Sequence, residues 1–171
     1  MWWSRAAATC GLFLLLAACG FQPLYGERGG RDQALVEMAS IAVGPIADRL
    51  GQIVRNELRD RLTPRGVPIS PLYRLAVFVN TRREAVAFND DESVTRFNFT
   101  LNARYVLTEV ASGQVIVSGS TRSVAAYNVV LSEFANLAAE NDATARAARD
   151  ISEEIRTRLG VYFSQRIDEQ A

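Results

Sequence analysis

Few side chains in this sequence could carry out covalent chemistry, and its two cysteines are the most informative of them. The chain contains no histidine and no lysine, so every basic side chain is an arginine. Cys19 directly follows the small residues Ala17 and Ala18 at the end of an apolar run. Without an imidazole base or a set of His and Cys ligands, neither a paired thiol nucleophile nor a zinc site can be assembled. The position of Cys19 points instead to processing of the chain at this residue.

Residues 1–18 have the features of a secretory signal. Arg5 supplies a positive charge, residues 6–16 form the apolar run, and small residues follow. The run is too short to span a bilayer, which takes about 20 apolar residues. The ending Leu16-Ala17-Ala18-Cys19 resembles the bacterial lipobox. This resemblance implies that the Cys19 thiol is diacylglycerated, that the chain is cut before it, and that the new amine is acylated.

Acylation at Cys19 would anchor the chain to a membrane, because two or more acyl chains hold a protein there stably. The alternative is an ordinary signal peptide whose cleavage site happens to contain a cysteine. Cys10 is a poor acylation site, since Ala7-Ala8-Thr9 precedes it and the apolar run comes after it. We expect acyl chains on Cys19 and no other cofactor or metal.

The composition narrows the possible functions. Removal of residues 1–18 from the 171-residue chain leaves 153 residues, which suits one domain with a real core. This part carries 18 arginines and 19 acidic residues, so no basic excess suggests a nucleic-acid partner. No second apolar stretch is long enough to cross a membrane.

An enzyme would have to rely on carboxylates, serine or tyrosine. Paired carboxylates of the glycosidase type cannot be judged from sequence, because their separation is spatial. The clearest acidic groups lie in stretches typical of turns or solvated helix faces: Asp90, Asp91, Glu92, Glu153 and Glu154. A binding or structural role is favoured, and we expect no catalytic residues.

Hydrophobic periodicity predicts six elements in one domain over residues 40–167, after a glycine-containing tether at 19–39 and before a short tail at 168–171. The strands are expected at 40–46, 72–79 with a continuation to Phe88, 95–108 and 115–127. A helix begins at Asp48, which would cap it, and ends near Leu62. A long helix covers 132–165, with a kink or restart possible at Asn141-Asp142.

The order βαβββα predicts an α/β fold, a two-layer sandwich in which two helices pack on one face of a four-stranded mixed sheet. Alternation of apolar and polar residues with a period of two is clearest over 95–108. The apolar residues that would be buried begin with Phe97, and the polar residues that would face water begin with Arg96. The second sheet face would carry Arg96, Asn98, Thr100, Asn102 and Arg104. Such a face is either simply solvated or in contact with a polar partner, for instance the water-facing wall of a large outer-membrane barrel.

Three stretches carry a family resemblance. They are Cys19-Gly20-Phe21-Gln22-Pro23-Leu24-Tyr25-Gly26, residues 138–142 and residues 151–163. These stretches and the order of elements resemble the LptE family of lipopolysaccharide-assembly lipoproteins, in particular its alphaproteobacterial branch.

The resemblance implies a non-enzymatic plug that lies in the lumen of the LptD β-barrel as a one-to-one complex. Such a protein helps the barrel to assemble and lipopolysaccharide to reach the outer leaflet. It also implies a lipid anchor on the periplasmic side of the outer membrane, because Gly20 stands where an aspartate would tend to retain a lipoprotein in the inner membrane.

Four arginines are candidates for contact with lipopolysaccharide phosphates or with the barrel: Arg82, Arg83, Arg96 and Arg104. A guanidinium can pair with phosphate in two-point fashion. Ordinary surface arginines or salt bridges within the domain are the alternative. The loop 88–93 is acidic where better-known family members carry a basic residue, which makes direct lipopolysaccharide binding less secure than the barrel partnership.

Two other functions are considered. A free, periplasm-facing lipid-binding lipoprotein without a barrel partner would need an apolar pocket between sheet and helices that is large enough for acyl chains. A carboxylate-based cell-wall hydrolase would need a convergent acidic pair with perturbed pKa values.

Overall fold

The computed structural model describes residues 29–88 and 94–169. The signal segment, Cys19, Gly20 and the acidic residues 89–92 lie outside the described residues, so the predictions that concern them remain predictions. Within the described ranges, no helix is long and apolar enough to cross a membrane.

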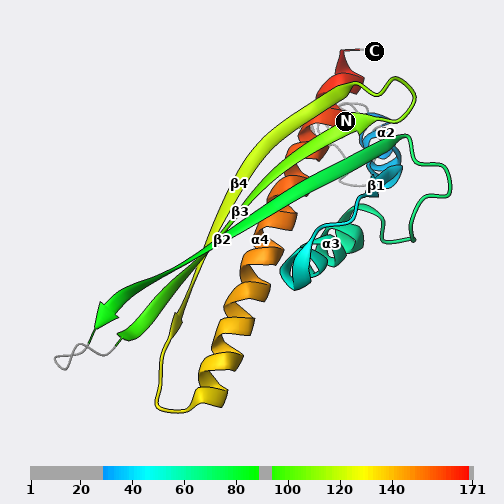
Figure 1. Cartoon of the computed structure of the whole chain (residues 1–171). Helices are drawn as coiled ribbons and strands as arrows, with labels where there is room; N and C mark the ends of the chain where they lie inside the picture. Colours follow the sequence, from blue (N-terminus) through cyan, green and yellow to red (C-terminus); the bar gives the residue numbers. More distant parts are fainter. Residues whose placement is uncertain (1–28, 89–93, 170–171) are drawn as a thin grey trace, which may run out of the picture.

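A mixed four-stranded sheet forms one layer of the domain (Figure 1). Its strands, in spatial order, are β1 (Ile41–Val43), β2 (Tyr73–Phe88), β3 (Val94–Glu109) and β4 (Val115–Asn128). β1 pairs with β2 in parallel, and the other two pairings are antiparallel. The helices α2 (Gly29–Ala39), α3 (Asp48–Leu62) and α4 (Glu133–Asp168) lie together on one side of the sheet. The expected α/β class and mixed sheet are confirmed.

The alternation predicted for β3 is confirmed on its inner face. Five residues of that face are buried: Phe99, Leu101, Ala103, Tyr105 and Leu107. In register with them stand apolar partners from both neighbouring strands, for example Leu75 of β2 and Val117 of β4 beside Leu107. Thr100 is an exception, because it belongs to the outer face and is still buried. Its register neighbours Arg82 and Val124 flank it from both strands.

α4 covers the inner face of the sheet as one continuous helix of 36 residues, without a break at Asn141-Asp142. Its buried side chains are small in the first half and large in the second: Ala143, Ala147, Ala148, Ile151, Ile155, Leu159 and Phe163. Ser132 caps the helix by accepting a hydrogen bond from the Ala135 backbone N–H. α3 packs beside α4 and buries Val54, Leu58 and Leu62.

The expected cap of α3 is wrong. Its N-cap is Ala47, and no side chain caps the helix. Asp48 is instead the first helical residue, with a φ of 66°. Aspartate tolerates this left-handed conformation better than most residues do. The chain therefore turns sharply into α3 directly after β1.

The number of helices also differs from the prediction, since the described residues form three helices in the order αβαβββα. The additional helix is α2, which lies within the segment 19–39. Within residues 33–39 of α2, the buried residues are Ala34 and Met38, and they pack toward α4. Leu35 and Val36 lie between these two residues in the sequence and are exposed. The apolar residues of this segment therefore form no continuous stripe at helical spacing, and the sequence pattern does not indicate a helix. Contacts with α4, more than 100 residues away in sequence, hold the helix in place.

A polar cluster joins α2, β2 and α4. The Tyr73 hydroxyl donates a hydrogen bond of 2.7 Å to Glu37 Oε2 and accepts one of 3.3 Å from Arg166 Nη1. Tyr73 also stacks at a tilt on Phe163, with ring centroids 5.2 Å apart. Burial, followed by the interaction with Glu37, raises the pKa of Tyr73 to about 12. The folded protein therefore favours the neutral tyrosine.

This raised pKa predicts a loss of stability in alkali. The contribution of Tyr73 is fully present below its unfolded pKa of about 10 and is lost as the pH rises through its folded pKa of about 12. At pH 8, Tyr73→Phe should lower the free energy of unfolding by about 0.5–1.5 kcal/mol, the usual value of a lost hydrogen bond. Urea unfolding followed by circular dichroism should show this difference narrowing between pH 9 and pH 11.5. A difference that stays constant over that range would contradict the assignment.

Two helical glycines should respond oppositely to alanine, although alanine normally stabilises a helix by roughly 0.5–1 kcal/mol. A Cβ at Gly51 would lie 2.7 Å from Ile46 Cγ2 and 2.9 Å from its carbonyl carbon, whereas one at Gly160 would lie 3.5 Å from Met38 Sδ. We expect Gly51→Ala to lower the free energy of unfolding by about 1–3 kcal/mol and Gly160→Ala to raise it by up to about 1 kcal/mol. Urea unfolding at neutral pH measures both. Stabilisation by both variants would show that the close contact at Gly51 is absent.

Candidate functional site

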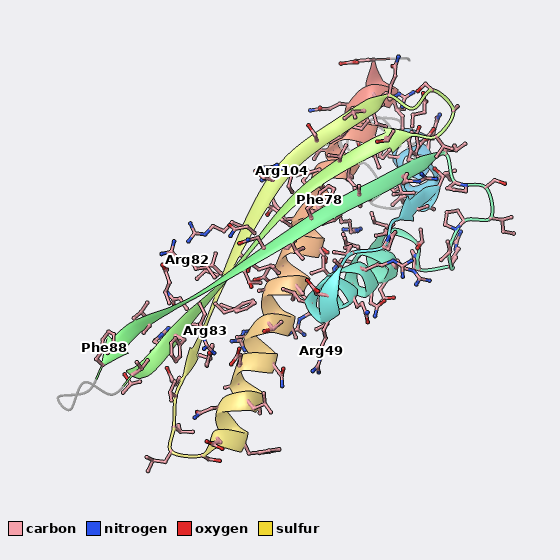
Figure 2. The ribbon with its side chains drawn as sticks, viewed as in Figure 1. Arg49, Phe78, Arg82, Arg83, Phe88 and Arg104 are labelled. Carbon is pink, nitrogen blue, oxygen red and sulfur yellow. The ribbon has the colours of Figure 1, made fainter. Side chains whose placement is uncertain are left out.

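The outer face of the sheet is not covered by any helix of the described chain, and we call it the open face (Figure 2). Its residues come from alternate positions of β2, β3 and β4, which stand side by side in register. The three central rows are Phe78–Arg104–Ser120, Asn80–Asn102–Arg122 and Arg82–Thr100–Val124. The face is therefore polar and carries one large exposed aromatic ring, that of Phe78, which is 65% exposed.

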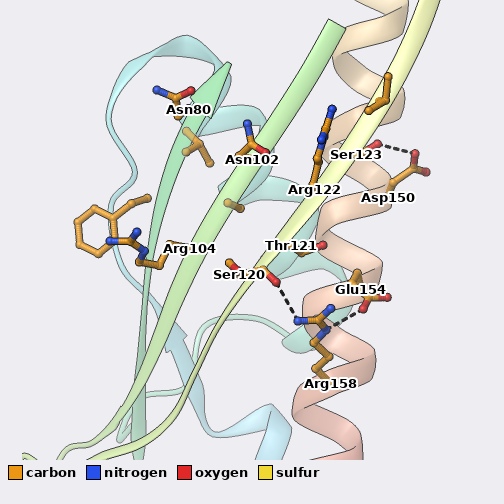
Figure 3. A pocket seen from close by; sticks show the side chains of 14 residues that line it. Asn80, Asn102, Arg104, Ser120, Thr121, Arg122, Ser123, Asp150, Glu154 and Arg158 are labelled. Carbon is orange, nitrogen blue, oxygen red and sulfur yellow. Dashed lines mark hydrogen bonds and ion pairs between the residues drawn. The ribbon is translucent and has the colours of Figure 1, made fainter. Parts of the chain in front are cut away.

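A shallow hollow of about 840 Å³ crosses the first two of these rows and continues over β4 to α4 (Figure 3). Its lining is dominated by polar side chains, among them Asn80, Asn102, Arg104 and Arg122. Carbonyl-bearing amides and guanidinium groups of this kind bind polar or anionic groups. The hollow is therefore suited to a polar surface rather than to acyl chains.

Positive charge is concentrated on the open face. By strand alternation, this face holds five exposed arginines: Arg74, Arg82, Arg96, Arg104 and Arg122. The acidic residue at the same set of strand positions is Glu84, which lies 2.7 Å from Arg82. The whole chain has equal numbers of acidic and basic residues. The open face is thus cationic, whereas the three described helices carry ten arginines and twelve acidic residues, which nearly balance.

Three of the four predicted arginines lie on this face, namely Arg82, Arg96 and Arg104. Arg83 does not, because successive residues of a strand point to opposite sides. It lies on the helix side, where its Nη1 is 3.2 Å from Glu140 Oε2 and its guanidinium carbon is 5.0 Å from the Phe97 ring centroid. Interaction with the Tyr127 hydroxyl, and then with Glu140, raises the pKa of Arg83. For Arg83, a salt bridge within the domain is the better description.

Phe78, Asn80 and Arg122 are site residues that the sequence analysis did not single out. A signal for Phe78 was present, because the apolar residues Tyr73, Leu75 and Val77 alternate along β2 and share one face. Phe78 therefore belongs to the other face. Arg122 lies in β4, where glycine and serine residues obscure the alternation. Its position became clear only through its pairing with Asn102.

Side chains of α4 bind the outer edge of β4. Arg158 Nη1 donates to the Ser120 carbonyl at 2.8 Å, and Arg146 Nη2 donates to the Ala126 carbonyl at 3.0 Å. Between them, the Ser123 hydroxyl donates to Asp150 Oδ2 at 2.9 Å (Figure 3). Hydrogen bonding to Glu154 raises the pKa of Arg158. The edge of the sheet is thus occupied by side chains of its own domain.

Within the described residues, no group of three or more His, Cys, Asp or Glu side chains could hold a metal ion. The open face offers guanidinium groups, amides and hydroxyls, which bind partners through hydrogen bonds and charge. The arrangement supports recognition of a polar or anionic surface.

Comparison with known proteins identifies the family. The family model described as LptE, Lipopolysaccharide-assembly, matches residues 38–159. The chain belongs to the LptE family. The match covers the four strands, α3 and most of α4, so the open face lies within the LptE region. Cys19 precedes that region.

Other proteins are similar to this chain in sequence or in fold. A protein of Rickettsia prowazekii (strain Madrid E), described as uncharacterized, is 25% identical over 152 residues, which is 89% of this chain and 93% of the relative. A crystal structure of a candidate lipoprotein from Caulobacter crescentus CB15 is similar with a TM-score of 0.68 and 23% identity, covering 78% of this chain and 98% of the other. A minor lipoprotein from Acinetobacter baumannii has a TM-score of 0.55 and 17% identity, covering 71% and 91%. The two structures share the fold.

The different environments of neighbouring arginines predict different effects on stability. Arg83→Ala removes a cross-element salt bridge and a cation–π contact, so it should lower the free energy of unfolding by about 0.5–1.5 kcal/mol. Arg82→Ala, on the open face, should change it by less than about 0.5 kcal/mol. Thermal or urea unfolding of both variants tests this. Equal effects would show that Arg83 is not held against Glu140 and Phe97.

Proposed function

We propose that this LptE-family protein is an outer-membrane lipoprotein that lies inside the lumen of the LptD β-barrel as a one-to-one partner. There it assists assembly of the barrel and enables lipopolysaccharide transport to the outer leaflet. Acyl chains on Cys19 would anchor it on the periplasmic side of the membrane. Membership of the LptE family carries the general role in lipopolysaccharide assembly.

The observation that favours the plug arrangement is the uncovered open face. Three strands of 14 to 16 residues present polar and cationic side chains to their surroundings over most of their length. The lumen of a large outer-membrane barrel is polar and hydrated, so such a face matches its wall. An apolar face would be left unmatched there.

The length of the domain also suits a plug. The 36 residues of α4 extend about 54 Å at 1.5 Å per residue. The hydrocarbon core of a bilayer is about 30 Å thick. A domain with α4 along the barrel axis would therefore extend through the whole membrane-spanning part of the barrel. One end would remain close to the anchored leaflet.

Arg82, Arg96 and Arg104 are the groups we propose for contact with the barrel wall or with lipopolysaccharide phosphates. All three lie on the open face, and phosphate or carboxylate groups can accept two parallel hydrogen bonds from each guanidinium. Arg104 borders the hollow beside Phe78. Arg83 is engaged by Glu140 and is the weakest of the four original candidates.

The free lipid carrier is less well supported. The space between sheet and helices is filled by buried side chains of β2, β3, α3 and α4. The hollow on the open face has a mainly polar lining, which does not suit acyl chains.

The proposal is tested by affinity isolation of the tagged lipoprotein from detergent-solubilised outer membranes, with mass spectrometry of the bound material. We expect a large β-barrel in equal amount. Recovery of lipid without a barrel would favour the free carrier and contradict the plug.

Charge-reversal variants locate the interface. Arg96→Asp and Arg104→Asp together should weaken barrel binding about tenfold. Each aspartate would face acidic groups of the barrel, or would leave a polar group of the barrel without its partner. The matched control is Arg49→Asp together with Arg149→Asp, which makes the same change in charge at exposed arginines of α3 and α4 (Figure 2 labels Arg49). Competition pull-downs at fixed protein concentration give the ratio. If the control weakens binding as much as the open-face variant, the interface lies on the helices or involves charge without regard to position.

A further inference from the structure

Apolar side chains are exposed at the end of the domain where α2 lies, which we call the α2 end. They come from α2, from the loop between α3 and β2, and from the turn between β3 and β4 (Figure 1). The residues are Leu35, Val36, Val67, Ile69, Leu72, Val110 and Val115. Ile69 is the extreme case, with a relative exposure of 101%. Single exposed apolar residues are normal, but a group of seven at one end marks an interaction surface.

Backbone hydrogen bonds join these segments into one surface. The Leu72 N–H donates to the Ser40 carbonyl at 3.1 Å, which links the loop to the end of α2. The Val110 N–H donates to the Leu72 carbonyl at 2.9 Å, which links the same loop to the β3–β4 turn. The exposed apolar residues therefore keep fixed relative positions.

A hollow of about 340 Å³ lies within this surface, between α2 and the first residues of the α3–β2 loop. Its apolar lining includes Leu35, Val36 and Pro64, and three arginines border it: Arg61, Arg65 and Arg156. Arg61 and Arg156 share Glu153, while Arg65 is exposed. Apolar groups beside arginines are typical of surfaces that lie at the boundary between acyl chains and phosphate headgroups.

The position of the acylation site indicates what covers this surface. α2 begins at Gly29, ten residues after Cys19. Even fully extended, ten residues reach about 36 Å at most. The acyl chains would therefore keep the α2 end close to the bilayer surface, whereas the first turn of α4 lies at the other end of a helix about 54 Å long.

We propose that the α2 end docks on the surface of the bilayer that holds the acyl chains. The exposed apolar side chains enter the headgroup region, and Arg65 faces the lipid phosphates. The proposal rests on acylation of Cys19, which the proposed function also requires. Docking at this end keeps the C-terminal end of α4, which lies beside α2, at the membrane surface. This is the end that the plug arrangement places close to the anchored leaflet, so docking fixes the orientation in which the open face is presented.

Tryptophan fluorescence can test the docking directly. Trp2 and Trp3 both precede Cys19, so the processed lipoprotein contains no tryptophan. Ile69→Trp places a single reporter at the α2 end. Leu131→Trp is the control at the opposite end, because Leu131 is 107% exposed and also has exposed apolar neighbours, Val130, Phe134 and Leu137. It therefore tests whether exposed apolar side chains alone are enough for docking. The control also measures the preference of tryptophan itself for membrane interfaces.

Each acylated variant is reconstituted into vesicles of phosphatidylethanolamine and phosphatidylglycerol with brominated acyl chains, and quenching of its fluorescence is measured. We expect the Ile69→Trp signal to fall at least twofold relative to unbrominated vesicles, with little change for Leu131→Trp. Absence of quenching at both positions would overturn the proposal. Equal quenching at both would also overturn it, because the domain would then lie flat on the membrane.

The two proposals can fail separately. Mass spectrometry first establishes that the variants are acylated at Cys19. Barrel recovery in the affinity experiment together with no quenching at position 69 would reject the docking and leave the plug function in place. Quenching at position 69 without barrel recovery would support the docking and reject the plug.

Discussion

The packing of α4 against the inner face of the sheet is the interaction on which the other features of the domain depend. The strands β2, β3 and β4 each have one apolar face, and a single long helix covers most of that face. Small side chains at Ala143 and Ala147 allow close approach near the start of α4, and Ile151, Ile155 and Leu159 fill the wider part of the interface. α3 and α2 then pack against α4. Because all three helices of the described residues lie on this side, none of them covers the other face of the sheet.

Much of this arrangement could be predicted from the sequence, because the features concerned are local. Short-range patterns give the bounds of α3, the alternation in β3 and the turn at Ser112–Gly113. They also indicate which alternate residues of the strands lie on the open face. α2 could not be predicted, since its two buried residues gain their stability from α4 across a long sequence separation. The cap of α3 failed for a different reason: Asp48 is a favourable capping residue in general, but the tight turn after β1 places it inside the helix with a positive φ.

The candidate site likewise combines features that local sequence patterns predict with features that depend on residues far away in the sequence. The strand period alone separates Arg82 from Arg83, and it places Arg82, Arg96 and Arg104 together on the open face. What the sequence did not contain was the partner of each arginine. Arg83 meets Glu140 from a distant helix, whereas Arg104 stands beside Phe78 and Ser120 in register. The cationic character of the open face is likewise invisible in a composition with equal numbers of acids and bases.

The two arginines that bind the edge of β4 affect how readily this edge could pair with strands of another β-structure. An unprotected edge strand is a template onto which further strands can add. Arg146 and Arg158 occupy the outward carbonyls of Ala126 and Ser120, so a growing sheet has fewer free groups to recruit there. During assembly of a β-barrel, many unpaired strands are present at the same time. In the proposed plug arrangement, the edge of β4 would therefore offer fewer free carbonyls to strands of the barrel than the edge of β2 beyond Leu75, where β1 no longer pairs with it.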